Sequence, residues 1–307
     1  MDGEKMTYVY TMQAFASAPD EGNAAGVVLQ EAPGDPAPSV VCGSGLREEA
    51  MQRLAAELNY SETAFVQSVG SNTVRIRYFT PLREIEMCGH ATVASFALLL
   101  ERGILAPGRW ILETQEASYR VLAEPDRIWI DFGMPQPGEV LTEEQTAELC
   151  RAYGLTPEDL ADADRLPVQK VTAGIPDIHM IVRNQETLLR AEQDAEAVCE
   201  ISRRLQAVGV HMSCIAELQE GKISCSNFAP LYGIAEECAT GTSNAGLTAL
   251  LYSRGFLAAD TPVRILQGEH MHRLGHLWSR AESQADGIHV MIGGQAVCTG
   301  SFRKKEE

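Results

Sequence analysis

The sequence contains one pattern of residues twice, with the two copies about 150 positions apart. In the first copy, residues 74–79 alternate polar and apolar side chains, and an acidic loop leads through a cysteine to a helical apolar run at 88–100. In the second copy, residues 223–228 alternate in the same way, before a similar loop and the run at 238–251. The same elements in the same order predict a chain built from two duplicated halves.

The length of the chain and one irregular segment predict where the halves divide. The 307 residues exceed one average domain and suit two domains of roughly 150 residues each. A short strand at 129–132 is followed by glycines and prolines at 133–138, which break regular structure. We therefore predict an N-terminal domain of residues 1–132 and a C-terminal domain of residues 133–307, whose last strand can return to the first domain.

Periodicity predicts further helices and strands. Residues 48–58 carry apolar side chains on one helical face, and Asn59 is suited to end that helix. Helices are also predicted at 143–153, 157–163 and 194–208, and strands at 63–67, 168–171 and 179–182. For the helix at 157–163, Thr156 is expected to cap and Pro157 to occupy the first helical position.

The charge balance excludes one class of partner. The chain has 42 acidic and 25 basic residues, a net charge of −17, and shows no cluster of lysine and arginine that would bind a phosphate backbone. No nucleic-acid partner is therefore expected. A small anionic substrate stays open, because local backbone dipoles can hold a single carboxylate.

Other motifs bear on location and cofactors. Residues 1–12 lack the apolar stretch of a signal peptide, and the apolar run at 93–100 is too short to cross a bilayer. We therefore expect a cytoplasmic protein with no membrane partner. The eight cysteines include no CxxC pair and are expected to be reduced thiols, most of them buried. Without a P-loop, a GxGxxG after a strand or a GxSxG, no nucleotide or flavin is expected, and we predict no cofactor.

The two repeated helix starts are the main site candidates. The first turn of a helix exposes unpaired N–H groups and a partial positive charge, which suit a carboxylate. Small residues let a ligand approach such a backbone closely. We expect the residues that bind the substrate to be those of the two helix starts, namely Gly89, Ala91, Gly241, Thr242 and Ser243.

Two cysteines occupy matching places in the repeat. Cys88 and Cys238 are expected at the two helix starts, where the dipole lowers the pKa of a thiol. Two opposed thiols could remove a proton from one face of a carbon and return one to the other face. The alternative is that both are ordinary buried cysteines.

Carboxylates form a second set of candidates. Glu62 lies just before an apolar strand, and if it points inward, burial would raise its pKa and suit it for acid–base catalysis. The alternative is a solvated glutamate in a turn. Glu236 and Glu237 lie beside Cys238 and are either acids that interact with the helix dipole or a second proton-handling group.

The histidines are weaker candidates for a functional site. His270, His272 and His276 have a spacing that suggests a metal site, but without a nearby cysteine or a clear element we interpret them as loop and strand histidines. No metal site is therefore predicted. His179 either lines a pocket or is a satisfied core histidine.

Several segments together carry a family resemblance. They are Phe15 and residues 21–28, 61–65, 78–81, 88–92, 228–230, 239–242 and 293–296. With them the chain resembles, over nearly its whole length, the PhzF-like family, named for an isomerase of phenazine biosynthesis and related in fold to diaminopimelate epimerase and proline racemase. The resemblance implies an α+β fold of two pseudo-symmetric domains, each a curved, mostly antiparallel sheet around a central helix. It also implies an active site between the domains and, often, a homodimer.

The resemblance also implies roles for individual residues. In the phenazine isomerase, the glutamate that matches Glu62 shuttles a proton, and its neighbours match His90, Glu237 and Thr242. This chain has Glu237 where that enzyme has aspartate and Thr242 where it has serine, which argues against the phenazine substrate itself. Cys238 is expected where the related epimerases and racemases hold their second catalytic thiol.

Three functions follow from these candidates. The leading hypothesis is an isomerase that moves a proton at a carbon alpha or vinylogous to a carboxylate, with Glu62 as the acid–base group. The second is an amino-acid racemase or epimerase that uses Cys88 and Cys238 on opposite faces of a carbon. The third, from another class, is a non-catalytic protein that binds a small molecule on the same fold.

Overall fold

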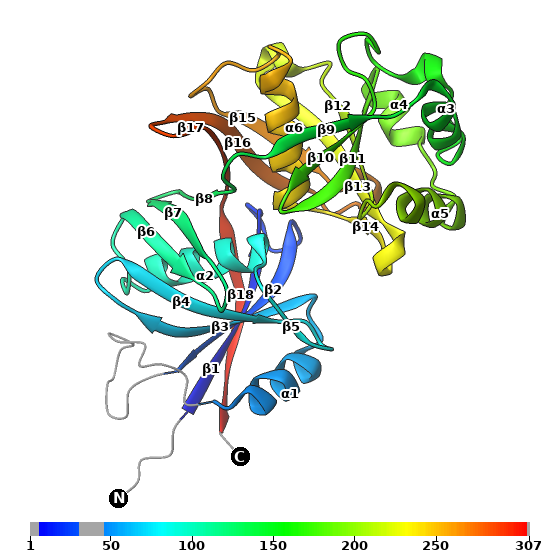
Figure 1. Ribbon diagram of the computed structural model, residues 1–307. Helices are drawn as coiled ribbons and strands as arrows, with labels where there is room; N and C mark the ends of the chain where they lie inside the picture. The colour runs from blue at the N-terminus through cyan, green and yellow to red at the C-terminus, as the bar shows by residue number, and fades with distance from the viewer. Residues whose placement is uncertain (1–5, 31–45, 306–307) are drawn as a thin grey trace, which may run out of the picture. The chain divides into compact units, whose positions relative to one another are not determined.

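The computed structural model describes residues 6–30 and 46–305, and the chain divides into two compact units (Figure 1). The first unit contains residues 1–131 and 293–307, and the second contains residues 132–292. Cys42 lies outside the described residues, and the other seven cysteines form no disulfide. Five of these seven are buried, so the prediction of free and mostly buried thiols is confirmed for the described cysteines.

The first unit is a mixed sheet wrapped around one helix. Its elements are β1 (Met6–Ala14), β2 (Asn23–Gln30), α1 (Glu48–Leu58), β3 (Glu62–Val69), β4 (Thr73–Phe79), β5 (Glu84–Ile85), α2 (Gly89–Glu101), β6 (Gly108–Glu113), β7 (Ser118–Glu124), β8 (Arg127–Asp131) and β18 (Ala296–Lys305). The strands pair in the order β18, β1, β2, β3, β4, β6, β7, β8. Only the β2–β3 and β4–β6 pairs in this order are parallel, and α1 and α2 are their crossover helices.

The second unit repeats this connectivity. Its elements are β9 (Gln136–Val140), α3 (Glu143–Arg151), β10 (Gln169–Ala173), β11 (Ile175–Val182), α4 (Gln185–Arg190), α5 (Ala195–Leu205), β12 (Val210–Cys214), β13 (Lys222–Ala229), β14 (Ile234–Glu237), α6 (Gly241–Ser253), β15 (Val263–Gln267), β16 (Gly275–Gln284) and β17 (Gly287–Gly294), with four short 3-10 turns. The β11–β12 and β13–β15 pairs are parallel, and α6 is the crossover between β13 and β15. The chain is thus an α+β protein, and its two units have the duplicated strand–loop–helix order that the sequence predicted.

The two crossover helices are buried on nearly every side. Most residues of α2 and of α6 are inaccessible to solvent, and α2 contacts strands from across its sheet, including β1, β2, β3 and β8. A helix that is apolar all round belongs in a core rather than on a surface. Each helix therefore lies inside the curve of its own sheet, and its N-terminus is fixed relative to the neighbouring strand ends (Figure 1).

The prediction of a helix at 157–163 is wrong. Only a single 3-10 turn forms, over Pro157–Asp159. Thr156 and Asp159 close that turn with a capping box, and Leu160 then leaves in an extended conformation and bridges to Val182. Pairing with β11 therefore overrides the local helical signal. The strand β9 also begins at Gln136, inside the segment predicted to be irregular.

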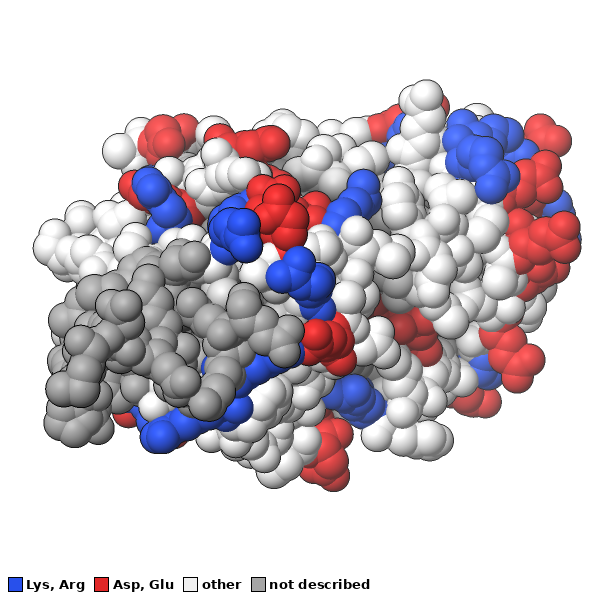
Figure 2. Space-filling view, turned by 90° about the horizontal axis from the view of Figure 1, so that it is seen from below, with Lys and Arg blue, Asp and Glu red and all other residues white. Residues whose placement is uncertain are grey.

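Two features of the described residues concern the surface charge and the length of the helices. Figure 2 shows acidic and basic side chains interspersed on the face that it presents, a pattern unlike a basic stripe for nucleic acid. In the part of the chain that the structure describes, no helix has the length and apolar character needed to span a membrane.

Two histidines lie side by side in the core of the second unit. His179 on β11 pairs in register with His211 on β12, and their ring centroids are 5.5 Å apart. The His211 ring nitrogens lie 3.0 and 3.1 Å from the amide oxygens of Asn227 and Asn244, whereas neither ring nitrogen of His179 has a hydrogen-bond partner among the described residues. His179 is thus a core histidine, but not the satisfied one that the sequence suggested.

Both histidines have lowered pKa values and are therefore neutral at neutral pH. Burial lowers the pKa of His179 well below 6.5, and the neighbouring His211 lowers it further. Burial also lowers the pKa of His211, to about 4, despite its hydrogen bonds to Asn227 and Asn244. Below about pH 6.5 these two histidines take up protons in the unfolded chain but not in the folded chain, so their contribution to the free energy of unfolding falls as pH falls toward 4.

Replacing His179 with leucine should reduce this acid sensitivity. Between about pH 7.5 and pH 5, His211 alone should lower the free energy of unfolding of the wild type by about 2 kcal/mol. His179 should lower it further. Urea unfolding at the two pH values measures both proteins. We expect His179→Leu to lose less stability than the wild type over this interval, and equal losses would contradict the assignment.

Candidate active site

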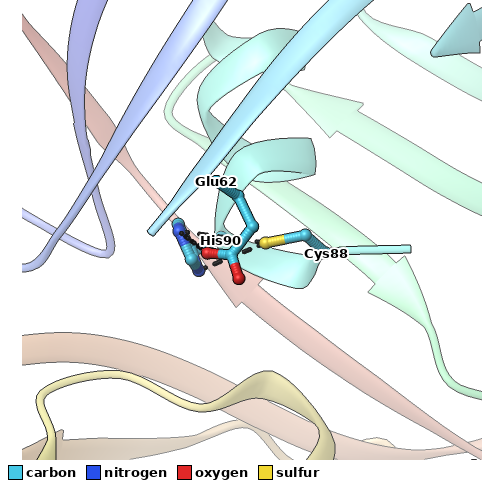
Figure 3. Close-up of side chains that lie close together, drawn as sticks. All are labelled: Glu62, Cys88 and His90. Carbon is cyan, nitrogen blue, oxygen red and sulfur yellow. Dashed lines mark hydrogen bonds and ion pairs between the residues drawn. The ribbon is translucent and has the colours of Figure 1, made fainter. Parts of the chain in front are cut away.

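Three of the predicted site residues meet where β3 and α2 begin (Figure 3). Glu62 is the first residue of β3, Cys88 is the N-cap of α2, and His90 lies in the first turn of that helix. His90 Nε2 is 3.2 Å from Glu62 Oε2, and His90 Nδ1 is 3.3 Å from Cys88 Sγ. The imidazole therefore lies between a carboxylate and a thiol.

Two further residues hold the imidazole ring. Asn23 Nδ2 lies 3.3 Å from His90 Nδ1, and Ser61 Oγ lies 3.3 Å from His90 Nε2. His90 is only 5% exposed, so these contacts fix its orientation. Both residues belong to segments that the sequence singled out, at 21–28 and 61–65, but neither was assigned a role there.

Hydrogen bonds from buried side chains hold the backbone at the start of α2. The hydroxyl of Thr92 donates to the carbonyl of Cys88 at 2.7 Å, and the hydroxyl of Tyr78 lies 2.6 Å from that of Thr92. Because the Thr92 proton is committed to Cys88, Tyr78 is the donor in the second bond. Tyr78 on β4 therefore fixes the backbone at the start of α2.

Glu62 is an anion at rest. Burial raises the pKa of Glu62, but its contacts with His90, Ser61 and Cys88 together outweigh burial, so the net pKa lies below the ordinary value of 4.5. The side chain is inward and 19% exposed, which rules out a solvated glutamate in a turn. The expected rise of the Glu62 pKa is nevertheless wrong, because the inward position also brings the carboxylate next to His90.

The partners of Glu62 are a cation and a neutral thiol. Burial lowers the pKa of His90, but the Glu62 carboxylate raises it, and the net pKa lies well above 6.5. Burial raises the pKa of the Cys88 thiol, and His90 only partly offsets this. The prediction that the helix dipole lowers the thiol pKa is therefore wrong for Cys88, since desolvation dominates.

Gly89 and Ala91 complete the first helix start. Gly89 is the first residue of α2, and Ala91 is buried within its first turn. The first N–H groups of a helix have no carbonyl partner inside it. The backbone here can therefore receive an anion close to Glu62 and His90.

The second helix start differs from the first at one position. The N-cap of α6 is Thr240, and the helix begins at Gly241, so Cys238 precedes the N-cap by two residues. Thr240 matches Cys88, because Asn244 binds the Thr240 carbonyl from one turn on, as Thr92 binds that of Cys88. The expectation that Cys88 and Cys238 occupy equivalent helix starts is wrong.

Cys238 is packed against two glycines. A Cβ at Gly268 would lie 2.8 Å from Cys238 Cα, and a Cβ at Gly275 would lie 2.1 Å from the Cys238 carbonyl oxygen. The cysteine itself is 3% exposed. Cys238 thus occupies a tightly filled place in the loop between β14 and α6.

A buried amide organises this loop. Gln267 on β15 accepts from Asn244 Nδ2 at 2.7 Å and from the Thr240 N–H at 3.3 Å. Its amide group donates to the Glu237 carbonyl at 2.6 Å and to the Thr240 hydroxyl at 3.0 Å. The Thr240 hydroxyl in turn donates to Glu237 Oε2 at 2.6 Å. Gln267 was missed in the sequence, where nothing in the local pattern marks it.

The remaining predicted residues lie in the first turn of α6. Gly241 packs against Phe132, Thr242 is half-buried, and Ser243 is buried with its hydroxyl donated to Asp177. The structure therefore groups Glu62, Cys88 and His90 with Gly89 and Ala91 in the first unit. Glu237, Cys238, Gly241, Thr242 and Ser243 belong to the second unit.

The three spaced histidines form no metal cluster with one another. His270 contacts Ser226 and Glu236 through Nδ1 and the Leu189 carbonyl through Nε2, while His276 contacts Arg264. Within residues 6–30 and 46–305, the group of histidine, cysteine and acidic side chains arranged to hold a metal is Glu62, Cys88 and His90.

Comparisons with known proteins agree with this architecture. The profile of a family described as "Phenazine biosynthesis-like protein" matches residues 12–301. An uncharacterized isomerase of Deinococcus radiodurans is 32% identical over 309 residues, which cover 95% of this chain and 92% of that protein.

Solved structures show the same fold. The crystal structure of a phenazine biosynthesis protein of the PhzF family from Bacillus anthracis has a TM-score of 0.81 at 25% identity, covering 98% of this chain and 100% of that one. A probable proline racemase from Agrobacterium radiobacter has a TM-score of 0.62 at 10% identity, covering 98% and 93% of the two chains. The second likeness concerns the fold alone.

Replacing Gln267 with methionine should destabilise the protein by about 2 kcal/mol or more, because the amide of Asn244 and the carbonyl of Glu237 lose their buried partner. Urea unfolding measures the change. The matched control is Gln219→Met, the same replacement at an exposed position, which should stay within about 0.5 kcal/mol of the wild type. Equal stability of the two variants would show that the network does not hold the loop.

Proposed function

Since this chain belongs to the phenazine biosynthesis-like family and is an isomerase, we propose that it moves a proton within a small carboxylate-bearing substrate, with Glu62 as the acid–base group and without a cofactor. The observation that carries the proposal is the Glu62–His90 pair. It supplies a carboxylate that is charged at rest and largely shielded from water.

The carboxylate has an oxygen available for a substrate proton. Glu62 Oε2 is buried, and no described residue makes a hydrogen bond with it, since its contact with His90 is an ion pair without hydrogen-bond alignment. A general base needs such a lone pair within reach of the proton that it removes. Glu62 is therefore the described group best suited to accept a proton from carbon.

The proposed reaction balances within the substrate. Glu62 takes a proton from a carbon alpha or vinylogous to the carboxylate, and the electron pair of the broken C–H bond delocalises into the conjugated carboxyl system. The neutral Glu62 then returns the proton to another carbon of the same molecule, which restores the carboxylate. His90 stays cationic throughout and stabilises the charged form of Glu62.

The substrate carboxylate has candidate binding groups at both helix starts. Gly89 and Ala91 in α2, and Gly241 and Thr242 in α6, present first-turn backbone with small side chains. Glu237, held through Thr240, is in this proposal a second proton-handling group. The proposal includes action as a homodimer, which light scattering during size-exclusion chromatography tests.

The two-thiol racemase is the weaker candidate. Cys238 lies before the N-cap of α6 and is almost fully buried. The residue at the position equivalent to Cys88 is Thr240, not Cys238. The Cys88 thiol also has a raised pKa, so it is a poor base at neutral pH. Both observations favour Glu62 as the group that transfers the proton.

Replacing Glu62 with glutamine should abolish most proton exchange. In D2O, NMR follows deuterium incorporation into a panel of small cyclic acids and amino acids, and we expect Glu62→Gln to exchange roughly 100-fold or more slowly than the wild type. The control is Glu49→Gln, an exposed glutamate of α1, which should exchange at the wild-type rate. Undiminished exchange in Glu62→Gln would reject the proposed base.

The Cys238→Ser variant separates the two mechanisms. If Glu62 transfers the proton, this variant should keep its deuterium incorporation within about tenfold of the wild type, because the sulfur does no chemistry. A thermal unfolding curve verifies that the variant is folded. Exchange that is lost in Cys238→Ser but survives in Glu62→Gln would establish the racemase mechanism instead.

A further inference from the structure

Glu62, Cys88 and His90 bring three different metal-ligating atoms together. A carboxylate oxygen, a thiol sulfur and an imidazole nitrogen all lie within 4.8 Å of one another. His90 Nε2 is 3.2 Å from Glu62 Oε2 and 3.8 Å from Cys88 Sγ. All three side chains point toward one small volume at the start of α2 (Figure 3).

One of these separations is close to an edge of a tetrahedral zinc site. Zinc binds sulfur at about 2.3 Å, and nitrogen and oxygen at about 2.0–2.2 Å, so neighbouring ligand atoms lie about 3.3–3.6 Å apart. The 3.2 Å between His90 Nε2 and Glu62 Oε2 is close to that range, whereas Cys88 Sγ lies 3.8 Å from Nε2 and nearer, at 3.3 Å, to Nδ1. A cation bound to His90 Nε2 and Glu62 would therefore gain its sulfur ligand by a rotation of the Cys88 side chain from Nδ1 toward Nε2.

The donor set selects the kind of metal. A thiolate combined with imidazole favours Zn²⁺, whereas Mg²⁺ and Ca²⁺ prefer oxygen ligands alone. Cys88 and His90 come from the rigid start of α2 and are 8% and 5% exposed, so two ligands are already ordered. Three protein ligands leave the fourth position of a tetrahedral site open.

The surroundings also suit a ligating histidine. When a histidine binds metal through one nitrogen, the other nitrogen usually donates to an oxygen that fixes the ring. The Asn23 side-chain amide lies 3.3 Å from His90 Nδ1, and rotation of that amide by half a turn would present its oxygen to the ring N–H. Asn23 can thus orient His90 for a metal at Nε2.

We propose that Zn²⁺ binds to Glu62, Cys88 and His90 in the first unit and inhibits the enzyme by occupying the carboxylate that would otherwise accept the substrate proton. Coordination replaces the protons on Cys88 sulfur and His90 Nε2, which are released to solvent. The binding rests on the geometry of the three side chains. The inhibition also rests on the proposed function of Glu62.

Metal binding is tested first, without any substrate. The full-length protein, freed of metal with a chelator, is titrated with Co²⁺ as a spectroscopic probe and with Zn²⁺ by calorimetry. We expect one equivalent to bind, with the absorption of a tetrahedral cobalt–thiolate site. Cys88→Ser should lose the sulfur-to-cobalt band and bind Zn²⁺ roughly 100-fold or more weakly. The control Cys298→Ser, at a half-buried cysteine of β18, should bind as the wild type does.

Two results would overturn the site. One is Zn²⁺ binding to Cys88→Ser with unchanged affinity, and the other is an octahedral cobalt spectrum without a sulfur band in the wild type. Circular dichroism verifies that each variant is folded. Because serine differs from cysteine by a single atom, Asn23→Ala provides a second variant, which should weaken Zn²⁺ binding about 10-fold or more.

Inhibition is measured by deuterium incorporation with and without one equivalent of Zn²⁺. We expect the metal to suppress exchange in the wild type and in Cys298→Ser, and a chelator to restore it. Zinc bound by the criteria above with no loss of exchange would overturn the inhibition. An absence of exchange in the metal-free wild type, together with a normal cobalt–thiolate spectrum, would contradict the proposed function and support the metal site.

Discussion

The ion pair between Glu62 and His90 is the interaction on which the candidate site depends. It holds a carboxylate in its charged form at a place that is largely closed to water, where burial alone would favour the neutral acid. The buried helix α2 fixes His90, while the start of β3 fixes Glu62, so both partners are positioned by the core of the first unit. The carboxylate, the imidazole and the Cys88 thiol lie close together, and these are also the donor groups of the proposed zinc site.

The two units share a connectivity but not a chemistry. In each unit a strand, a short strand and a loop lead to a buried crossover helix, and a side chain one turn into that helix binds the N-cap carbonyl. In the first unit the N-cap is Cys88, next to His90, whereas in the second it is Thr240, tied to Glu237 and Gln267. The first helix start therefore concentrates reactive groups, and the second is organised around a buried amide network.

Much of the fold follows from local sequence, and most of the site electrostatics does not. The alternation at 74–79 and 223–228 predicted β4 and β13, although the burial alternates only along the first part of β4 and β13 is buried on both faces. The prediction of a helix at 157–163 was wrong because pairing of Leu160 with Val182 outweighs the local helical signal. The low pKa of Glu62 and the role of Gln267 were not predictable, since both depend on partners distant in sequence that only the folded chain brings near.

The protonation state of His90 tests the central claim most directly. Nitrogen-15 NMR of the imidazole at neutral pH distinguishes the cation from either neutral tautomer, in the wild type and in Glu62→Gln. The ion pair predicts that both ring nitrogens of His90 carry protons in the wild type and that the ring becomes neutral when the carboxylate is removed. A neutral His90 in the wild type, or a ring that Glu62→Gln leaves unchanged, would contradict it.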